Sequence, residues 1–426
     1  MEEKIKVLVI SDHPMSPSGV GIQTRYMIEG LLKSGKFKFV CLGGAVKHQD
    51  YSPVKTKEWE DDWVIFPTDG YGNADMVRSL LRTERPDMVW FMTDPRFYEW
   101  LWMVENEIRQ HVPMIYYHVW DNFPYPTFNK KFYDSNDVIV AISKVTHEAV
   151  KNVAPDVELH YLPHAVDDKI FHNIEREDKH TFRKQTLKEE ERELNPERML
   201  FFWNNRNAKR KQSGTLIWWF KEFMDKVGKD NVGLLMHTDP KDSHGQDLEL
   251  ILEELGLVNG EVVLSSRKLP PEHISLMYNM ADCTINISDA EGFGLATLES
   301  LSCETPIIVN MTGGLQEQVT DGENWFGIGI EPKSKAIIGS QQVPFIFEDR
   351  MNKEDFIGAL EKMYDLWKNK PDEYQEMCKL GKQHVEKNYN FEKYQEQWVD
   401  IMTKVHEKYG SWENRKHYKT WDLAEL

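Results

Sequence analysis

The chain has 426 residues, a formal net charge of −18 and a pI near 5.4. This length suffices for two domains, and 40% hydrophobic with 29% charged residues is the composition of a globular protein. The acidic charge argues against nucleic-acid binding, which needs a basic surface, and against broad adhesion to anionic membranes. No run reaches the roughly 18–20 apolar residues of a membrane span, so we expect no integral membrane segment.

Short apolar runs alternate with helical patterns through the first half of the chain. We predict strands at 5–10, 37–42, 63–67, 87–92, 114–117, 137–141 and 157–162, and helices from the first loop to about 32 and at 74–84. Strands that alternate with helices predict a doubly wound parallel sheet.

The same pattern restarts in the second half, after a charged segment at 172–198 that we interpret as a solvated connecting helix. We predict strands at 199–203, 232–236, 262–264, 283–287 and 307–309, and helices at 212–227, 246–255, 271–280, 295–302, 355–368 and 391–409. The repetition indicates a second Rossmann-like domain, with the boundary near residue 168. The segment 331–349 fits either a hairpin or a loop over a cleft.

Residues 284–318 are the most informative stretch. Glu291 follows a strand and a loop, Gly292–Gly294 come next, and Glu299 lies eight residues after Glu291, about two turns into a helix. Glycines let the backbone approach a ligand, and a helix start offers unpaired N–H groups and partial positive charge to a diphosphate. Two carboxylates so spaced can hold two different hydroxyl-bearing parts of one ligand.

This block resembles the signature of retaining GT-B glycosyltransferases of the family 4 type. That signature reads E-G-F-G-L-x-x-x-E, followed by a G-T-P-V-like strand and a G-G turn. The corresponding residues here are Glu291–Leu295, Glu299, Glu304–Ile307 and Gly313–Gly314. Glu304 replaces the usual glycine, which is a mild departure.

The resemblance implies an α/β fold of the GT-B kind. Two Rossmann-like, doubly wound parallel-sheet domains would face each other, and a C-terminal helix would cross back to the first domain. We therefore expect an acceptor-side domain at 1–168, a nucleotide-sugar donor domain at 169–388, and the returning helix with a polar tail at 389–426.

A basic loop follows the strand at 199–203. Arg206 and Lys211 resemble the family's strand–G-R-x-x-x-x-K element and would clamp the diphosphate of a donor. Cations there would stabilise the negative charge that grows on the leaving phosphate. Arg210 competes for the role, and the glycine that precedes the arginine in the family is absent.

Two candidates belong to the first half. The family often places a histidine where His118 stands, at the end of strand 114–117 and close to the donor sugar; Asp121 is a weaker neighbour. In the first loop, Gly19 and Gly21 match a glycine-containing loop that approaches phosphate and acceptor. Position 24 is Thr, so the loop lacks the third glycine of a dinucleotide fingerprint.

Other features are less specific. Pro163–Asp167 with Phe171 resembles an interdomain element of the family, with His164 in place of the usual Asn. Asp12, His13, Asp94 and Asp239 are isolated and predict no metal site.

The four cysteines form no C-x-x-C pair, which predicts buried free thiols, and no apolar leader precedes the first strand. We therefore expect a cytoplasmic protein.

The implied activity is transfer of a sugar from a UDP- or GDP-sugar to an acceptor hydroxyl, with retention, without a cofactor, in glycan biosynthesis. The acceptor would be a glycan, a protein or a small molecule. The implied catalytic residues are Glu291, His118, Arg206 and Lys211; the donor-binding residues are Glu299, Gly292, Phe293, Gly294, Leu295 and Thr297; the phosphate and acceptor loop holds Gly19 and Gly21.

Three alternatives stay open from the sequence. A non-catalytic subunit would bind nucleotide sugar without turnover. A GT-B epimerase or phosphorylase would use the same fold for another reaction, although no cofactor lysine site for a phosphorylase is visible. A dinucleotide oxidoreductase is disfavoured by the missing third glycine.

Overall fold

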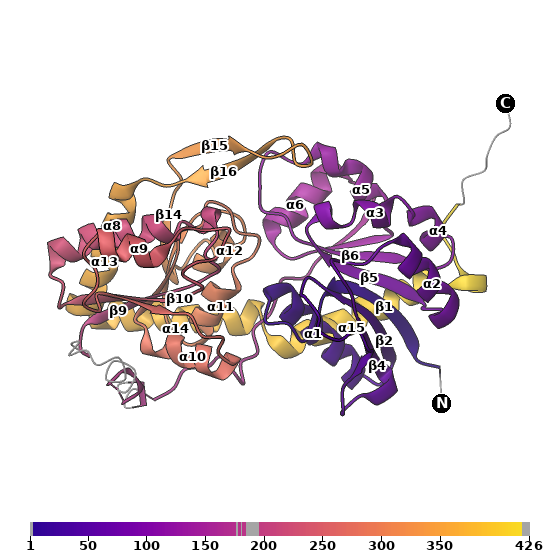
Figure 1. Cartoon of the computed structure of the whole chain (residues 1–426), viewed down its shortest axis with the longest axis horizontal. Helices are drawn as coiled ribbons and strands as arrows, with labels where there is room; N and C mark the ends of the chain where they lie inside the picture. The colour runs from indigo at the N-terminus through magenta and orange to yellow at the C-terminus, as the bar shows by residue number, and fades with distance from the viewer. Residues whose placement is uncertain (1–2, 176–177, 180, 185–195, 420–426) are drawn as a thin grey trace. The chain divides into compact units, whose positions relative to one another are not determined.

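The computed structural model describes residues 3–175, 178–179, 181–184 and 196–419, and Figure 1 labels its elements. The chain divides into two compact units. The first comprises the chain as far as Ala165, Gly339–Ile346 and the chain from Phe391; the second comprises Val166–Ile338 and Phe347–Asn390. A helix was expected over 172–198. Residues 178–179 and 181–184 are helical, whereas 172–175 and 196–198 are not. The other residues of this segment lie outside the described residues.

The first unit is built on an eight-stranded sheet of order β3-β4-β2-β1-β5-β6-β7-β8. All neighbouring strands are parallel except β3, which pairs antiparallel with β4. Its strands are β1 Ile5–Asp12, β2 Phe37–Gly44, β3 Val54–Lys55, β4 Trp63–Pro67, β5 Met88–Thr93, β6 Met114–His118, β7 Val138–Ala141 and β8 Glu158–Tyr161. The seven predicted strands of this half are all present.

Local capping explains where several helices of this unit begin. The side chains of Ser18, Asn73 and Ser143 accept hydrogen bonds from the first turns of α1, α2 and α6. The helices are α1 Gly19–Lys33, α2 Ala74–Glu84, α3 Glu99–Trp102, α4 Glu105–Arg109, α5 Lys130–Asp134 and α6 Lys144–Val153, with short 3-10 turns at Glu60–Asp62, Pro95–Phe97, Thr127–Asn129 and Trp412–Asn414.

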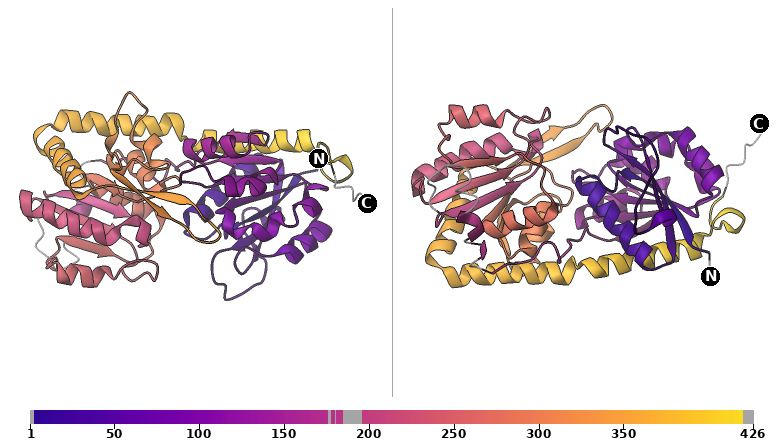
Figure 2. Two further views of the ribbon diagram at one scale, coloured as in Figure 1. Left: turned by 90° about the horizontal axis from the view of Figure 1, so that it is seen from above. Right: turned by 60° about the horizontal axis from the view of Figure 1, so that its bottom comes forward.

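The last long helix, α15 (Phe391–Tyr409), belongs to the first unit, as the resemblance implied. It lies beside α1 (Figure 2), where the rings of Tyr26 and Phe391 are 4.7 Å apart. Trp398 is fully buried and meets Trp90 of β5 and Tyr117 of β6, at centroid distances of 5.9 and 4.9 Å. One face of the first sheet is therefore completed by the end of the chain.

The second unit is built on a six-stranded parallel sheet of order β11-β10-β9-β12-β13-β14. Its strands are β9 Met199–Asn204, β10 Val232–His237, β11 Val262–Ser265, β12 Cys283–Asn286, β13 Ile307–Asn310 and β14 Gly327–Ile330. The helices are α8 Ser213–Val227, α9 Leu248–Glu254, α10 Pro271–Met280, α11 Leu295–Ser302, α12 Leu315–Val319, α13 Lys353–Asn369 and α14 Pro371–Asn388.

Alternation along β9 shows how helices cover both faces of this sheet. Phe201 packs edge-on against Phe220 of α8, while its neighbour Phe202 packs against Tyr278 of α10, on the other face. Strands buried on both faces read as continuous apolar runs, which is why β9 was visible in the sequence.

Three elements of the second unit were not predicted from the sequence: helices α12 and α14 and strand β14. Helix α14 buries a stripe that includes Tyr374, Cys378 and Val385 among many charged residues. The segment 331–349 forms a hairpin of β15 (Ser334–Ile338) and β16 (Ile346–Arg350), one of the two forms expected. Within the described residues, no helix is long and apolar enough to cross a membrane.

Candidate active site

The loop after β12 presents the first of the two predicted carboxylates. Parallel strands place their carboxyl ends at one edge of a sheet, and Glu291 lies at that edge, between β12 and α11. The Lys211 ammonium donates to the Glu291 carboxylate in an ion pair, with the two side chains 8% and 12% exposed. Asn286, at the end of β12, donates to the same oxygen over 3.4 Å.

The ionisation of Glu291 is set by opposing effects. Burial acts to raise its pKa, but the charges of Lys211 and Arg210 outweigh burial and hold the pKa below its ordinary value. The carboxylate is therefore ionised at neutral pH. It is a fixed acceptor of hydrogen bonds from hydroxyl groups, held in place by a buried cation.

Asp289 ties the same loop to other segments of the unit. Gln212 and Arg350 each donate to Asp289 Oδ2 over 2.5 Å, and Arg210 donates to the carbonyl oxygen of Ala290. Burial raises the pKa of Asp289 to about 6, against the opposing effects of Gln212 and Arg350. Since Arg350 ends β16, the hairpin insertion is bonded directly to the candidate site.

The glycines of the motif are needed for steric reasons. Gly294 has φ +93°, and a Cβ there would lie 2.5 Å from Leu315 Cδ2. A Cβ on Gly314 would lie 2.7 Å from both Gly292 O and Phe293 Cα. Phe293 is buried, so it anchors the loop through its ring. The backbone is thereby brought close to the start of α11.

The start of α11 is open to an anion through its backbone. Leu295 is the first helical residue, and the first-turn N–H groups have no partner inside a helix. The Thr297 hydroxyl is fully buried, 2.8 Å from Gly294 O and 2.6 Å from Gln318 Oε1. Thr297 can therefore contribute its N–H, whereas its hydroxyl stabilises the turn.

Glu299, the second carboxylate, has a different environment. Tyr278 OH donates to Glu299 Oε2 over 2.7 Å, and Asn204 Nδ2 donates to Tyr278 OH over 2.9 Å. Burial raises the pKa of Glu299 to about 7, although the Tyr278 hydroxyl acts in the opposite direction. The two carboxylates of the motif are thus held in different protonation regimes.

Arg206 does not join the cluster around Glu291 in the contacts of the described residues. Its guanidinium donates to Asp242 over 2.6 Å and approaches His244 Nδ1 at 2.8 Å, and its side chain is 61% exposed. Arg210, the competing candidate, is the arginine that reaches the loop of Glu291. Of the two cations expected to clamp a diphosphate, Lys211 therefore lies against Glu291, whereas Arg206 is paired with Asp242.

In the first unit, Gly19 and Gly21 lie in the first turn of α1. Ser18 caps this helix by accepting from Gly21 N over 3.0 Å and donates to Asp12 Oδ2 over 2.5 Å. A Cβ on Gly21 would lie 2.3 Å from Ser16 Oγ, so the loop after β1 folds tightly over the helix start. Gly19 is exposed at this start.

His118 ends β6 and is fully buried. Tyr133 OH lies 2.7 Å from His118 Nε2, and Asn129 Nδ2 donates to Tyr133 OH over 3.4 Å. If Tyr133 accepts from Asn129, its own proton goes to His118 Nε2, so Nδ1 carries the ring proton. Nδ1 is buried without a hydrogen-bond partner in the described part of the chain. Burial lowers the pKa of His118 to about 3, so the ring is neutral.

The division between the two units falls inside the Pro163–Asp167 element, between Ala165 and Val166. His164 Nδ1 lies 2.8 Å from Tyr117 OH, and burial lowers the pKa of His164 to about 3. Phe171, further on, is buried in the second unit against Tyr278, at a centroid distance of 6.1 Å.

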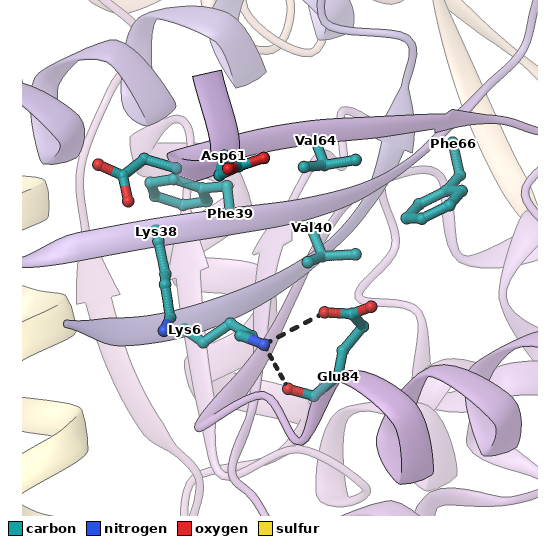
Figure 3. A pocket seen from close by; sticks show the side chains of 9 residues that line it. Lys6, Lys38, Phe39, Val40, Asp61, Val64, Phe66 and Glu84 are labelled. Atoms are coloured by element: carbon teal, nitrogen blue, oxygen red, sulfur yellow. Dashed lines mark hydrogen bonds and ion pairs between the residues drawn. The ribbon is translucent and has the colours of Figure 1, made fainter. Parts of the chain in front are cut away.

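A pocket of about 270 Å³ lies elsewhere in the first unit, near the amino-terminal ends of β1 and β2 (Figure 3). Lys6 donates to the carboxylate and the carbonyl oxygen of Glu84, and Asp62 pairs with Lys4. Lys6, Asp61, Asp62 and Glu84 of its lining are each in an ion pair, and ligands of such sheets bind at the opposite strand ends. We therefore do not count this pocket as part of the site.

Sequence reasoning missed several polar residues that the fold brings to the motif. Asn204, Gln212, Tyr278 and Arg350 come from four different segments. Only the tertiary fold joins these segments. A buried Asn205 Nδ2 without a hydrogen-bond partner in the described residues, next to the basic loop, belongs with them.

Comparison with solved structures defines the class of the fold. The chain superposes on a sucrose-phosphate synthase from Thermosynechococcus elongatus with a TM-score of 0.73, at 14% identity, over 95% of this chain and 100% of that one. It superposes on Anabaena HepE, solved with UDP-glucose, with a TM-score of 0.67, at 13% identity, over 94% and 100% of the two chains. The two parallel-sheet units with the final helix on the first are the GT-B glycosyltransferase fold.

Comparison of sequences adds a family match over part of the chain. Residues 241–357 match the model of the glycosyl transferases group 1, and the motifs of this segment are of the GT4 type. The D-inositol 3-phosphate glycosyltransferase of Acidothermus cellulolyticus is 36% identical over 77 residues, 18% of this chain and 17% of that protein. The trehalose synthase of Thermococcus litoralis is 24% identical over 184 residues, 43% and 38% of the two. The matched segments thus span well under half of these relatives.

Proposed function

We propose that the protein transfers a sugar from a nucleoside diphosphate sugar to an acceptor hydroxyl, with retention of the anomeric configuration. One observation carries the proposal: the ionised Glu291 is paired with the buried Lys211 directly before the Gly294 turn into α11. At this edge of the sheet, the carboxylate suits the sugar hydroxyls of such a donor, and the cation and the open helix N–H groups suit its diphosphate.

The proposed roles follow from the contacts. Glu291 would accept hydrogen bonds from sugar hydroxyls near the anomeric centre. Lys211 and Arg210 would stabilise the charge that grows on the leaving diphosphate, together with the first-turn N–H groups of Leu295 and Thr297. Glu299 would bind the ribose hydroxyls. Arg206 would contribute only after leaving Asp242.

His118 would act as a hydrogen-bond donor to the sugar or the reacting centre, and not as a general base, because its ring is neutral and weakly basic. We propose front-face attack, in which the leaving phosphate accepts the acceptor's proton while the new glycosidic bond forms and the old one breaks. Gly19 and Gly21 would approach the acceptor or a phosphate.

The compartment and acceptor are part of the proposal. All four cysteines are free and buried, as expected, which suits a reducing compartment, and we propose a cytoplasmic enzyme. Within the described residues, no group of His, Cys, Asp and Glu could hold a metal ion. The acceptor would be a glycan, a protein or a small molecule.

A thermal-shift panel of UDP, GDP, ADP and their sugar conjugates, without metal and then with Mg²⁺, tests the proposal. A nucleotide that binds only the native state raises the melting temperature, and the responding nucleotide names the base. We expect the shift to be lost in Arg210→Ala, and transfer to be lost in Glu291→Gln. A rise in melting temperature without any transfer or hydrolysis would favour a non-catalytic binding subunit. Conversion of the donor in the absence of an acceptor would favour an epimerase. No shift at all in folded protein would refute the proposal.

A further inference from the structure

A hydrogen-bond chain leads from the end of β9 through α10 to α11. Asn204 donates to Tyr278 OH, and Tyr278 donates to Glu299 Oε2, over 2.9 and 2.7 Å. The Asn204 Nδ2 atom can only donate, so the hydroxyl oxygen of Tyr278 accepts this hydrogen bond. The single proton of the Tyr278 hydroxyl is therefore directed to Glu299. The direction of the whole chain is therefore fixed.

Tyr278 is rigidly placed. It is fully buried, and its ring packs edge-on against Phe202 at 5.1 Å and Phe171 at 6.1 Å. Such packing restricts the ring, and its hydroxyl is directed at one oxygen of Glu299, Oε2. The other oxygen, Oε1, has no donor among the residues that the structure describes.

We propose that Asn204 and Tyr278 are positioning residues that hold the Glu299 carboxylate for the ribose diol and make donor affinity depend on pH. This inference rests on the proposed function and deepens it. Tyr278 occupies one carboxylate oxygen and leaves the other for the ligand.

The charges and the burial around Glu299 determine the direction in which donor affinity changes with pH. Burial raises the pKa of Glu299 to about 7, and in the described contacts no Lys or Arg pairs with it. The titratable groups near it are Tyr278, whose pKa lies well above its ordinary value, and Cys303, whose pKa is raised to about 12; both stay neutral. Ser275, which lies 3.7 Å from Cys303 Sγ, and Asn279, which donates to Ser275 O, do not titrate.

A ribose diol donates to the ionised carboxylate, so binding favours the ionised form and releases a proton. Donor affinity should then rise with pH up to about 7 and level off above it. The slope below the midpoint is at most about tenfold per pH unit.

Calorimetry of UDP binding, or of the nucleotide that the panel selects, tests this between pH 5.5 and 8.5. Tyr278→Phe keeps the ring and removes the donor, so we expect about tenfold weaker binding at pH 7 and a midpoint shifted to higher pH by about one unit. Asn204→Ala should act in the same direction and serves if Tyr278→Phe folds poorly. The matching 2′-deoxynucleotide should bind more weakly to the wild type and lose most of this pH dependence.

Tyr374→Phe is the control, since this buried tyrosine of the same unit donates to Asp282 O over 2.7 Å, outside the chain. In turnover, Tyr278→Phe should raise the donor KM and leave kcat at saturating donor nearly unchanged. A wild type that binds nucleotide with a flat pH profile, or a Tyr278→Phe profile equal to that of the wild type, would overturn this inference alone. Wild-type protein that binds no nucleotide would overturn the proposed function with it.

Discussion

Lys211 and Glu291 lie 80 residues apart in sequence and form a buried ion pair at the carboxyl edge of the second sheet. A buried pair is sensitive to the loss of one partner, because the other is left as an unpaired charge. The same contact that places the Glu291 carboxylate therefore also supports the fold of its loop.

Loss of Lys211 should destabilise the protein more than loss of the pair. Lys211→Met leaves Glu291 buried and unpaired, which costs about 3–5 kcal/mol, whereas adding Glu291→Gln should recover part of this. Urea unfolding of both single variants and the double variant measures the coupling. Lys209→Met, in the same turn but exposed, should change stability by less than about 0.5 kcal/mol. Additive effects in the cycle would contradict the pairing.

Arg210 should matter more than Arg206 for nucleotide affinity. Arg210 lies beside the loop of Glu291, whereas Arg206 is held by Asp242. We expect Arg210→Ala to weaken nucleotide diphosphate binding by about tenfold or more, and Arg206→Ala to change it less than threefold; each such cation contact is worth roughly 1.5–3 kcal/mol. The two variants carry the same change, so titration calorimetry compares them directly. If Arg206→Ala weakened binding more than Arg210→Ala, Arg206 would bind the diphosphate, as the resemblance implied.

Ionisation of His118 should not contribute to the pH dependence of the reaction rate. Its pKa of about 3 keeps the ring neutral from pH 5 to 9. His118→Gln should therefore lower kcat/KM without changing the shape of the profile. Tyr133→Phe, which removes the partner that fixes the ring proton, should lower kcat by roughly tenfold. Tyr98→Phe is the control, because it removes a buried hydroxyl that lies 2.9 and 2.6 Å from the backbone carbonyl oxygens of Ile10 and Met92. A titration near pH 6.5 that vanishes in His118→Gln would show that the ring does ionise.

Glycine is required at Gly294 but not in α13. Gly294→Ala forces a side chain into the left-handed region and to 2.5 Å from Leu315, so we expect about 1–3 kcal/mol of destabilisation and weaker donor binding. A Cβ at Gly358, inside α13, meets nothing within 4 Å. Gly358→Ala should instead stabilise by about 0.5–1 kcal/mol. Thermal unfolding distinguishes the two, and equal effects would contradict the steric argument.

The stability of the unliganded protein should respond to pH through Glu299. Its folded pKa of about 7 lies above its ordinary value, so its contribution is fully present below about pH 4.5 and is lost as the pH rises through 7. Glu299→Gln does not ionise, so the melting temperature of the variant relative to wild type should increase from pH 5 to pH 8. A difference that stays constant over this range would argue against a raised pKa.

The sequence predicted most strands of both sheets, because strands such as β9 and β12 are apolar runs between polar turns. It predicted the Glu291 loop because the glycines and carboxylates are adjacent in sequence. It did not predict α14, whose buried stripe is diluted by charged residues, or Tyr278 and Arg350, which reach the site from other elements. The pairing of Arg206 with Asp242 could not be predicted for a related reason: spacing along a loop does not determine which side chain turns toward the sheet edge and which toward Asp242.

The position of α15 has a consequence for how the protein is made. Trp398 closes a face of the first sheet around Trp90 and Tyr117, so the N-terminal unit contains a core residue from near the end of the chain. During synthesis that face stays uncovered until α15 has left the ribosome, whereas the strands of the six-stranded sheet of the second unit have all been made by residue 330. The unit that is translated first is therefore the last to be completed.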